Sequence, residues 1–192
     1  RRIINDITLI LSRKHLYNNI QKISFSDILT GLANRRLFDY VLDREMKKAA
    51  RSARPLSLLM LDIDYFKNIN DTFGHQVGDA IIEQVGALLK ENCRNIDLAA
   101  RYGGEEFAII LPETERDDAL ALAERLREKI ASNHFQIAQH LINITVSIGV
   151  TTLSSPGSNP ESLILAADRA LYQAKQAGRN VVLFTGTEPK PQ

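Results

Sequence analysis

The stretch at residues 98–111, LAARYGGEEFAIIL, decides the fold at the centre of the chain. Two short apolar segments flank Gly103 and Gly104, and consecutive glycines supply the positive φ angles that a tight hairpin turn needs. The sequence therefore predicts an antiparallel β-hairpin. Its tip carries two adjacent carboxylates, Glu105 and Glu106, which raises the question of what acids do on so tight a turn.

Helical and extended patterns alternate along the rest of the chain. Residues 56–63, LSLLMLDI, form a short apolar run that ends in charge, which is typical of a strand buried on both faces. A loop is expected at residues 65–71. The expected elements are a helix capped by Asn34, strand 56–63, a helix from about residue 77, strands 98–102 and 107–111, helix 116–132, strand 142–150, a helix from Pro160 to Gly178 and strand 181–184. This order predicts an α+β fold with a mainly antiparallel sheet flanked by helices.

The composition limits the classes of function. The chain has 192 residues, which suits one domain with an appendage, and its 44% hydrophobic and 24% charged residues are close to the globular average. Lys and Arg total 24 against 23 acids, so the chain lacks the basic surplus of many nucleic-acid binders, and no nucleic acid polymer is expected as a partner. A single cysteine, Cys93, fits a reducing, cytoplasmic setting.

Residues 1–25 differ from the rest. Apolar residues at three- and four-residue spacing predict a helix with a partly interrupted coiled-coil seam, joining the domain to an upstream sensor. The alternative is a helix packed on its own domain. The chain begins without Met, so we expect a fragment whose full-length protein could be membrane-anchored elsewhere. The expected parts are a linker helix at 1–25, a core domain at 26–185 and a tail at 186–192.

Acidic residues gather at two bends of the predicted sheet. Asp62 and Asp64 lie where strand 56–63 ends, and Glu105 lies on the hairpin tip. If the hairpin lies beside that strand, Asp62 and Glu105 converge, and such like charges persist together only when protonated or neutralised by a cation. Mg²⁺ suits two acids on an open edge, and two such ions about 3.5–4 Å apart serve in-line phosphoryl chemistry. The alternative is that acids collect at turns because turns are wet.

The segment after this strand offers groups for a nucleotide. Residues 65–71 present backbone N–H groups and Lys67 near the predicted metal, as a phosphate site needs, although the glycine spacing of a Walker motif is absent. Asn70 and Asp79 flank two glycines, and a carboxylate at the mouth of an apolar slot accepts from guanine but is left unpaired by adenine. The alternative makes Asp79 an early-turn helix acid favoured by the helix dipole.

Together these segments resemble the GGDEF family of diguanylate cyclases, which join two GTP molecules into cyclic di-GMP. The resemblance covers about residues 26–185, and the ordered series is far more specific than any one segment. Glu105 replaces the Asp of the family name and keeps the carboxylate. The matching segments are DILTGLANRR (27–36), LDIDYFKNINDTFGHQVGD (61–79), RYGGEEF (101–107), SIGV (147–150) and ADRALYQAKQAGRN (167–180).

The resemblance implies a ferredoxin-like, palm-type fold and a role for each matching residue. Two Mg²⁺ ions per site, with Mn²⁺ as a substitute, would be held by Asp62, Glu105 and the carbonyl of Ile63. Glu105 also matches the acid proposed to help deprotonate the attacking 3′-hydroxyl, and Glu106 lines the same site. The remaining matches are Asn70 and Asp79 for guanine, and Phe66, Lys67, Lys175 and Arg179 for the phosphates.

The resemblance also implies how the activity is organised. One domain holds one GTP, so catalysis needs a homodimer that faces two sites, with loss of two pyrophosphates. Arg94 and Asp97 match the family's inhibitory RxxD site for the product, with Arg125 as a secondary contact; the alternative for Arg94 and Asp97 is a surface ion pair. Rival functions are an inactive domain that senses GTP or cyclic di-GMP, a cyclase with a hybrid product, which Asp79 disfavours, and a purely structural signalling module.

Overall fold

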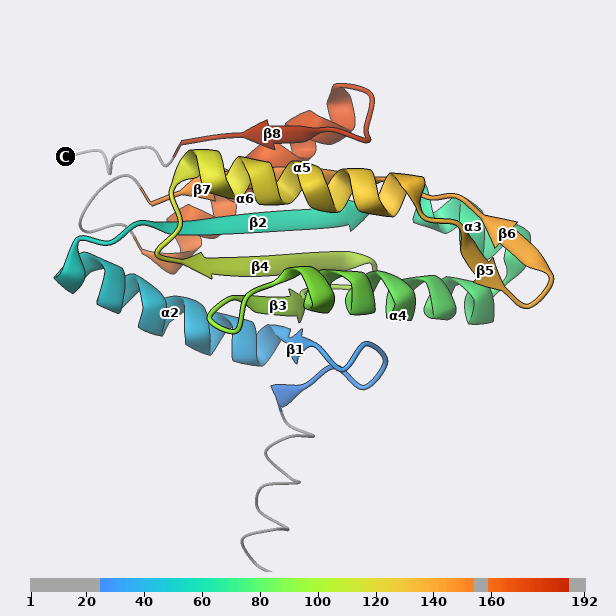
Figure 1. The fold of residues 1–192 in the computed structure, drawn as a ribbon, viewed down its shortest axis with the longest axis horizontal. Coiled ribbons are helices and arrows are strands. Elements are labelled where there is room, and N and C mark those ends of the chain that lie inside the picture. Colours follow the sequence, from blue (N-terminus) through green and yellow to red (C-terminus); the bar gives the residue numbers. More distant parts are fainter. Residues whose placement is uncertain (1–24, 154–158, 187–192) are drawn as a thin grey trace, which may run out of the picture.

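The structure, a computed structural model, describes residues 25–153 and 159–186. These residues form a six-stranded mixed sheet in the order β1-β3-β4-β2-β7-β8, together with a separate β5-β6 hairpin (Figure 1). The predicted linker helix at 1–25 lies outside the described residues except for Phe25, and so does the tail beyond residue 186. The strands are β1 (Ala33–Asn34), β2 (Leu56–Ile63), β3 (Leu98–Arg101), β4 (Glu106–Pro112), β5 (Phe135–Ile137), β6 (His140–Ile142), β7 (Val146–Thr152) and β8 (Val182–Phe184); the helices are α2 (Arg35–Ser52), α3 (Phe66–Phe73), α4 (His75–Asn92), α5 (Arg116–Ser132) and α6 (Pro160–Gln176).

The centre of the sheet is antiparallel. Strand β2 pairs with β4 on one side and with β7 on the other, and β4 also pairs with β3 in the predicted hairpin. The short edge strands β1 and β8 are parallel to their neighbours. The predicted α+β class with a mainly antiparallel, palm-type sheet is confirmed.

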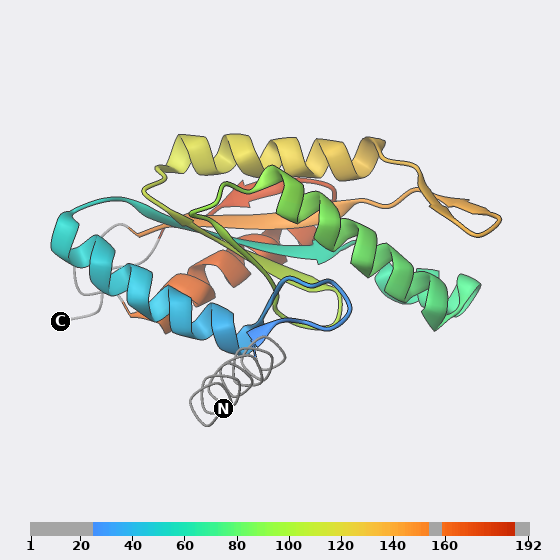
Figure 2. The same ribbon diagram turned by 60° about the horizontal axis from the view of Figure 1, so that its bottom comes forward.

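Helices cover both faces of the sheet (Figures 1 and 2). Because side chains alternate along a strand, Leu59 and Leu61 of β2 join the core under α4 and α5, whereas Leu58 and Met60 join the core under α2 and α6. Every residue of β2 is buried, as predicted. Burial stabilises each such side chain by about 1.5–3 kcal/mol. The same alternation turns Asp62 toward α6.

The prediction of a loop at residues 65–71 is wrong, because most of this segment is helical. Tyr65 adopts a left-handed conformation, with φ 56°, which reverses the chain directly after β2, and helix α3 begins at the next residue. Phe66 and Ile69 lie three positions apart, so both reach the core beneath α4. The site segment is therefore a short helix with a free N-terminus.

The hairpin forms where predicted, but not through positive φ angles at its glycines. Among the described glycines, positive φ occurs at Gly31, Gly74 and Gly178. The backbone N–H groups of Tyr102 and Gly103 donate to the carbonyl of Glu106 at 2.8 and 3.2 Å and close the turn. A Cβ at Gly103 would overlap the Glu106 carboxylate, so a side chain there would displace that acid.

Other boundaries follow the expected local rules. Asn34 caps α2 by accepting from the N–H of Leu37 at 3.0 Å, and Asn159 caps α6 in the same way. Helix α5 has the predicted bounds. The expected strand at 142–150 is divided between β6 and β7, and the β5-β6 hairpin was not predicted. Within residues 25–153 and 159–186, no helix is long and apolar enough to cross a membrane.

Candidate active site

The two acidic bends lie side by side at one end of the sheet. Asp62 is directly opposite Glu106 in the β2-β4 register, and the N–H of Ile63 donates to the carbonyl of Glu105 at 3.4 Å. Asp62 is 8% exposed, while both glutamates are half-buried. The convergence expected for Asp62 and Glu105 is thus a consequence of strand pairing.

The electrostatics of this cluster call for positive charge. Burial raises the pKa of Asp62, the charges of Glu105 and Glu106 raise it further, and Lys175 opposes both effects. The ammonium of Lys175, in the last turn of α6, lies 2.7 Å from a carboxylate oxygen of Asp62. Lys175 therefore supplies one of the charges that this group of acids needs.

The donor set fits an open Mg²⁺ site and does not fit a closed protein cage. Across the described residues, no three His, Cys, Asp or Glu side chains form a cluster that could hold a metal by themselves. Mg²⁺ is commonly bound through one or two carboxylates and completed by water and substrate phosphates. Asp62, Glu105 and the carbonyl of Ile63 match that arrangement.

The predicted phosphate residues surround this end of β2. Phe66 and Lys67 form the first turn of α3, where backbone N–H groups have no partner within the helix and favour an anion. Lys67 is exposed, and the guanidinium of Arg179 lies 4.5 Å from the ring centroid of Tyr65, the residue that precedes α3. Lys175 completes the set from α6.

The predicted guanine residues meet where α3 and α4 touch. The side-chain oxygen of Asn70 is buried and has no hydrogen-bond partner, which is unusual for a buried polar atom. A Cβ at Gly78 would overlap this oxygen, so the glycine leaves the space that Asn70 uses. Asp79 follows, exposed, and no acid occupies the first turn of α4, which begins at His75. The alternative of an early-turn helix acid therefore loses its basis.

The RxxD residues lie at the opposite end of β3 from the hairpin tip, in the turn between α4 and β3. The N–H of Arg94 donates to one carboxylate oxygen of Asp97 at 2.8 Å, and the other oxygen is buried without a partner. The pKa of Asp97 is raised by burial, and the hydrogen bond and the charge of Arg94 offset only part of this rise. Arg125 of α5 is close enough to lower the pKa of Cys93 beside this turn, so it lies on the same side of the domain.

A clamp on the hairpin tip was not foreseen from the sequence. Arg101 donates to the carbonyl of Gly104 through Nε at 3.0 Å and Nη2 at 2.8 Å, and it pairs with Asp27 at 3.3 Å. Burial acts to raise the pKa of Asp27, but hydrogen bonds from Thr30 and the charge of Arg101 outweigh it, so the pKa is lowered. The pairing joins residues 74 positions apart, which no local pattern reveals.

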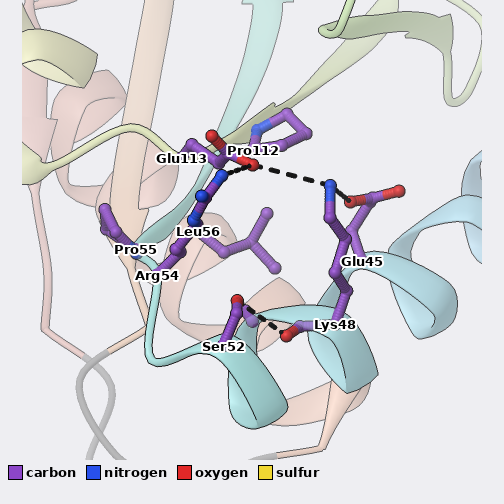
Figure 3. Close-up of a pocket in the computed structure, with 9 residues that line it drawn as sticks. Glu45, Lys48, Ser52, Arg54, Pro55, Leu56, Pro112 and Glu113 are labelled. Atoms are coloured by element: carbon purple, nitrogen blue, oxygen red, sulfur yellow. Dashed lines mark hydrogen bonds and ion pairs between the residues drawn. The ribbon is translucent and has the colours of Figure 1, made fainter.

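A hollow at the other end of β2 carries none of the predicted residues (Figure 3). Arg54 and Lys48 pair with Glu113 at 2.5 and 3.6 Å, and these ion pairs join the end of α2 to the turn after β4. Its volume of about 10 Å³ is no larger than a water molecule needs. This hollow is a structural seam.

Comparison with known proteins identifies the family of the chain. A family model described as diguanylate cyclase, GGDEF domain, matches residues 24–181. The chain belongs to the GGDEF family. Among curated members, response regulator PleD of Caulobacter vibrioides is 44% identical over 88% of this chain and 38% of its own length. Diguanylate cyclase A of Treponema denticola is 40% identical over 90% of this chain and 48% of its own.

The GGDEF fold is also shared with solved structures. The coiled coil and GGDEF domain of DgcB from Caulobacter crescentus, in complex with c-di-GMP, has a TM-score of 0.91 at 33% identity and covers 96% of this chain and 97% of its own. The active GGEEF domain of a diguanylate cyclase from Vibrio cholerae has a TM-score of 0.76 at 34% identity, with 80% and 97% covered. This chain spans less than half the length of the two curated relatives above.

Proposed function

We propose that this GGDEF domain is a diguanylate cyclase, a metal-dependent nucleotidyltransferase that condenses two GTP into cyclic di-GMP and two pyrophosphates. The observation that carries the proposal is the convergence of Asp62, Glu105 and Lys175 beside the free N-terminus of α3. Acids that need a cation, next to donors that favour an anion, suit a metal-bound triphosphate.

The chain's own residues supply position and proton transfer. Asp62, Glu105 and the carbonyl of Ile63 would hold two Mg²⁺ or Mn²⁺ ions, which when bound neutralise charge on the phosphates. Lys175 leaves Asp62 for a phosphate oxygen, and the backbone amides of Phe66 and Lys67 orient the same group. In each of two steps a 3′-oxygen bonds to an α-phosphorus, the bond to pyrophosphate breaks, and Glu105 assists removal of the hydroxyl proton. Arg179 contacts the phosphates, and Glu106 lines the site beside Asp62.

Guanine selection follows from two acceptors. The unpaired oxygen of Asn70 and the carboxylate of Asp79 can accept from the amino group and N1–H of guanine. Adenine presents an acceptor at N1 and lacks the amino group, so both protein groups would lose their partners. This argument disfavours the rival cyclase with a hybrid product.

A homodimer is part of the proposal because each domain carries one set of nucleotide residues. Residues 1–25 would act as the lever by which an upstream sensor aligns two domains, and the similar Caulobacter crescentus structure comprises a coiled coil and a GGDEF domain. Deleting residues 1–25 should lower turnover at dilute protein and restore it at high concentration. Unchanged turnover across a dilution series contradicts the lever. We place the reaction in the cytoplasm, whatever anchors the full-length protein.

Product inhibition through Arg94, Asp97 and Arg125 extends the proposal. The buried, unpaired oxygen of Asp97 is an acceptor without a donor, and guanine N–H groups are suitable donors. Arginine offers a planar fork for guanine edges and phosphate. The relative from Caulobacter crescentus was solved in complex with c-di-GMP, which supports a product site in this fold.

The second candidate is a domain that binds GTP or cyclic di-GMP without catalysis. The pairing of Asp62 with Lys175 and the retention of both glutamates favour an active enzyme. The test is incubation of the full chain with GTP and Mg²⁺, followed by mass analysis of the nucleotides. Asp62→Asn should lose at least about 100-fold in rate, whereas Asp43→Asn, in an exposed pair with Lys47, should retain the activity of the unaltered chain. Absence of product with GTP still bound would select the sensor.

A further inference from the structure

The turn that carries Arg179 has an unfavourable backbone conformation. Gly178, Arg179 and Asn180 have φ of 111°, 65° and 48° in succession. For residues with a Cβ, the left-handed region costs about 1–2 kcal/mol each, so surrounding contacts must hold it. Figure 1 shows this connection between α6 and β8 at the same end of the sheet as the end of β2 and the start of α3. The question is which residues hold it.

Asp64 holds the backbone of this turn through a hydrogen bond. Its side chain is 4% exposed and accepts the backbone N–H of Asn180 at 3.0 Å. It also accepts the hydroxyls of Thr145 at 2.6 Å and Ser147 at 2.7 Å, so both of its oxygens have donors. A carboxylate with its acceptors satisfied in this way is suited to positioning and poorly suited to binding a metal. Asp64, the first residue after β2, thus differs in role from Asp62, which lies two residues earlier within the strand.

Tyr65 contacts the side chain of Arg179 through both its ring and its hydroxyl. The guanidinium lies 4.5 Å from the ring centroid, and its Nη1 lies 3.4 Å from the tyrosine hydroxyl. Tyr65 is 59% exposed, so this contact occurs at the surface, beside the first turn of α3. A second anchor comes from α5, where Arg127 donates to the side-chain oxygen of Asn180 at 2.7 Å. Backbone and side chain of the turn are therefore both restrained.

We infer that Asp64 and Tyr65 are positioning residues that fix the turn at residues 178–180 and so present Arg179 to the triphosphate of GTP. The inference rests on the proposed function for its ligand. The end of β2 then organises both cations of this segment, because Asp62 pairs with Lys175 and Asp64 fastens the turn that bears Arg179. Preorganising a charged group in this way raises affinity by removing the cost of ordering it on binding.

The test combines a direct readout with a binding cycle on the full chain. The ¹⁵N NMR signal of the Arg179 side-chain Nε–H should shift or broaden in Tyr65→Ala and persist in Tyr65→Phe, which keeps the ring. Calorimetric titration with GTP should show about 2- to 5-fold weaker binding in Tyr65→Ala and about 10-fold or more in Arg179→Ala. Tyr40→Ala, which removes a similarly exposed ring on α2, is the matched control.

The decisive result is the double variant. If Tyr65 acts through Arg179, Tyr65→Ala should have no further effect on GTP affinity in the Arg179→Ala background. Additive losses, or an unchanged Arg179 signal in Tyr65→Ala, overturn the inference. Asp64→Asn provides a second arm: a folded variant should raise KM for GTP more than it lowers kcat. A chain that binds GTP but makes no cyclic di-GMP refutes the proposed catalysis. The inference about Asp64 and Tyr65 is then still tested by the GTP affinities of the single and double variants.

Discussion

Replacing Gly78 with alanine should impair guanine binding while leaving the fold intact. Gly78 is buried within α4, and a Cβ there would overlap the side-chain oxygen of Asn70 and lie 3.0 Å from Cζ of Phe66. The oxygen is the end of a flexible side chain, so Asn70 can rotate away at little cost. Its acceptor is then lost to guanine. The affected property is therefore recognition, and not packing.

The expected magnitudes separate these two effects. Alanine is favoured over glycine in a helix interior by about 1 kcal/mol, so Tm should stay level or rise by a few degrees. Loss of one hydrogen bond to a ligand costs about 0.5–1.5 kcal/mol, which corresponds to roughly a 2- to 12-fold increase in KM for GTP. A lower Tm with an unchanged KM for GTP would instead indicate that Gly78 matters for packing and not for guanine binding.

The assay compares GTP with inosine triphosphate, which lacks the 2-amino group that Asn70 would bind. Gly78→Ala should lower the preference for GTP over inosine triphosphate, and Asn70→Ala should do the same. Because both variants remove the same contact, the double variant should be no worse than Asn70→Ala alone. An unchanged KM for GTP in Gly78→Ala, or additive losses in the double variant, would refute the assignment of Asn70 to guanine.

Three further outcomes follow from other contacts. Gly103→Ala should reduce turnover about 10-fold by displacing the Glu106 carboxylate, and it should add nothing in a Glu106→Ala background. Burial raises the pKa of Cys93 to about 12, so alkylation of the folded chain at pH 8 should be roughly 1000-fold slower than for a free thiol, and rapid alkylation would contradict this burial. Arg94→Ala should abolish inhibition by added cyclic di-GMP, and fractional inhibition equal to that of the unaltered chain would remove the product site.

Patterns of burial made the sheet and its helices predictable from the sequence. The run at residues 56–63 is apolar throughout because helices cover both faces of β2, and this context left little choice of element. Periodic apolar residues with caps at Asn34 and Asn159 similarly determined α2 and α6. Adjacent strands then brought Asp62 to Glu105, since a hairpin beside β2 places their bends at one end.

Short elements were harder to predict because their signals are tertiary. Helix α3 has eight residues, too few for a strong periodic pattern, and it forms because Phe66 and Ile69 enter a core built by distant segments. The hairpin glycines suggested positive φ angles, yet Gly103 has none, and its missing side chain instead leaves room for the carboxylate of Glu106. The Asp27 to Arg101 clamp has no sequence signal of its own.

Sequence reasoning could not distinguish the roles of Asp62 and Asp64. The two are the same residue type and lie two positions apart, at the end of β2 and directly after it. Asp62 faces Lys175 and two glutamates, so its carboxylate retains a demand for cations. Asp64 meets two hydroxyls and a backbone N–H, which satisfy it completely within the chain. The donors to Asp64 come from Thr145, from Ser147 of β7 and from the turn after α6, all more than 80 residues away, so no local pattern separates the two aspartates. The division between a residue that binds and a residue that positions is therefore made by strand pairing.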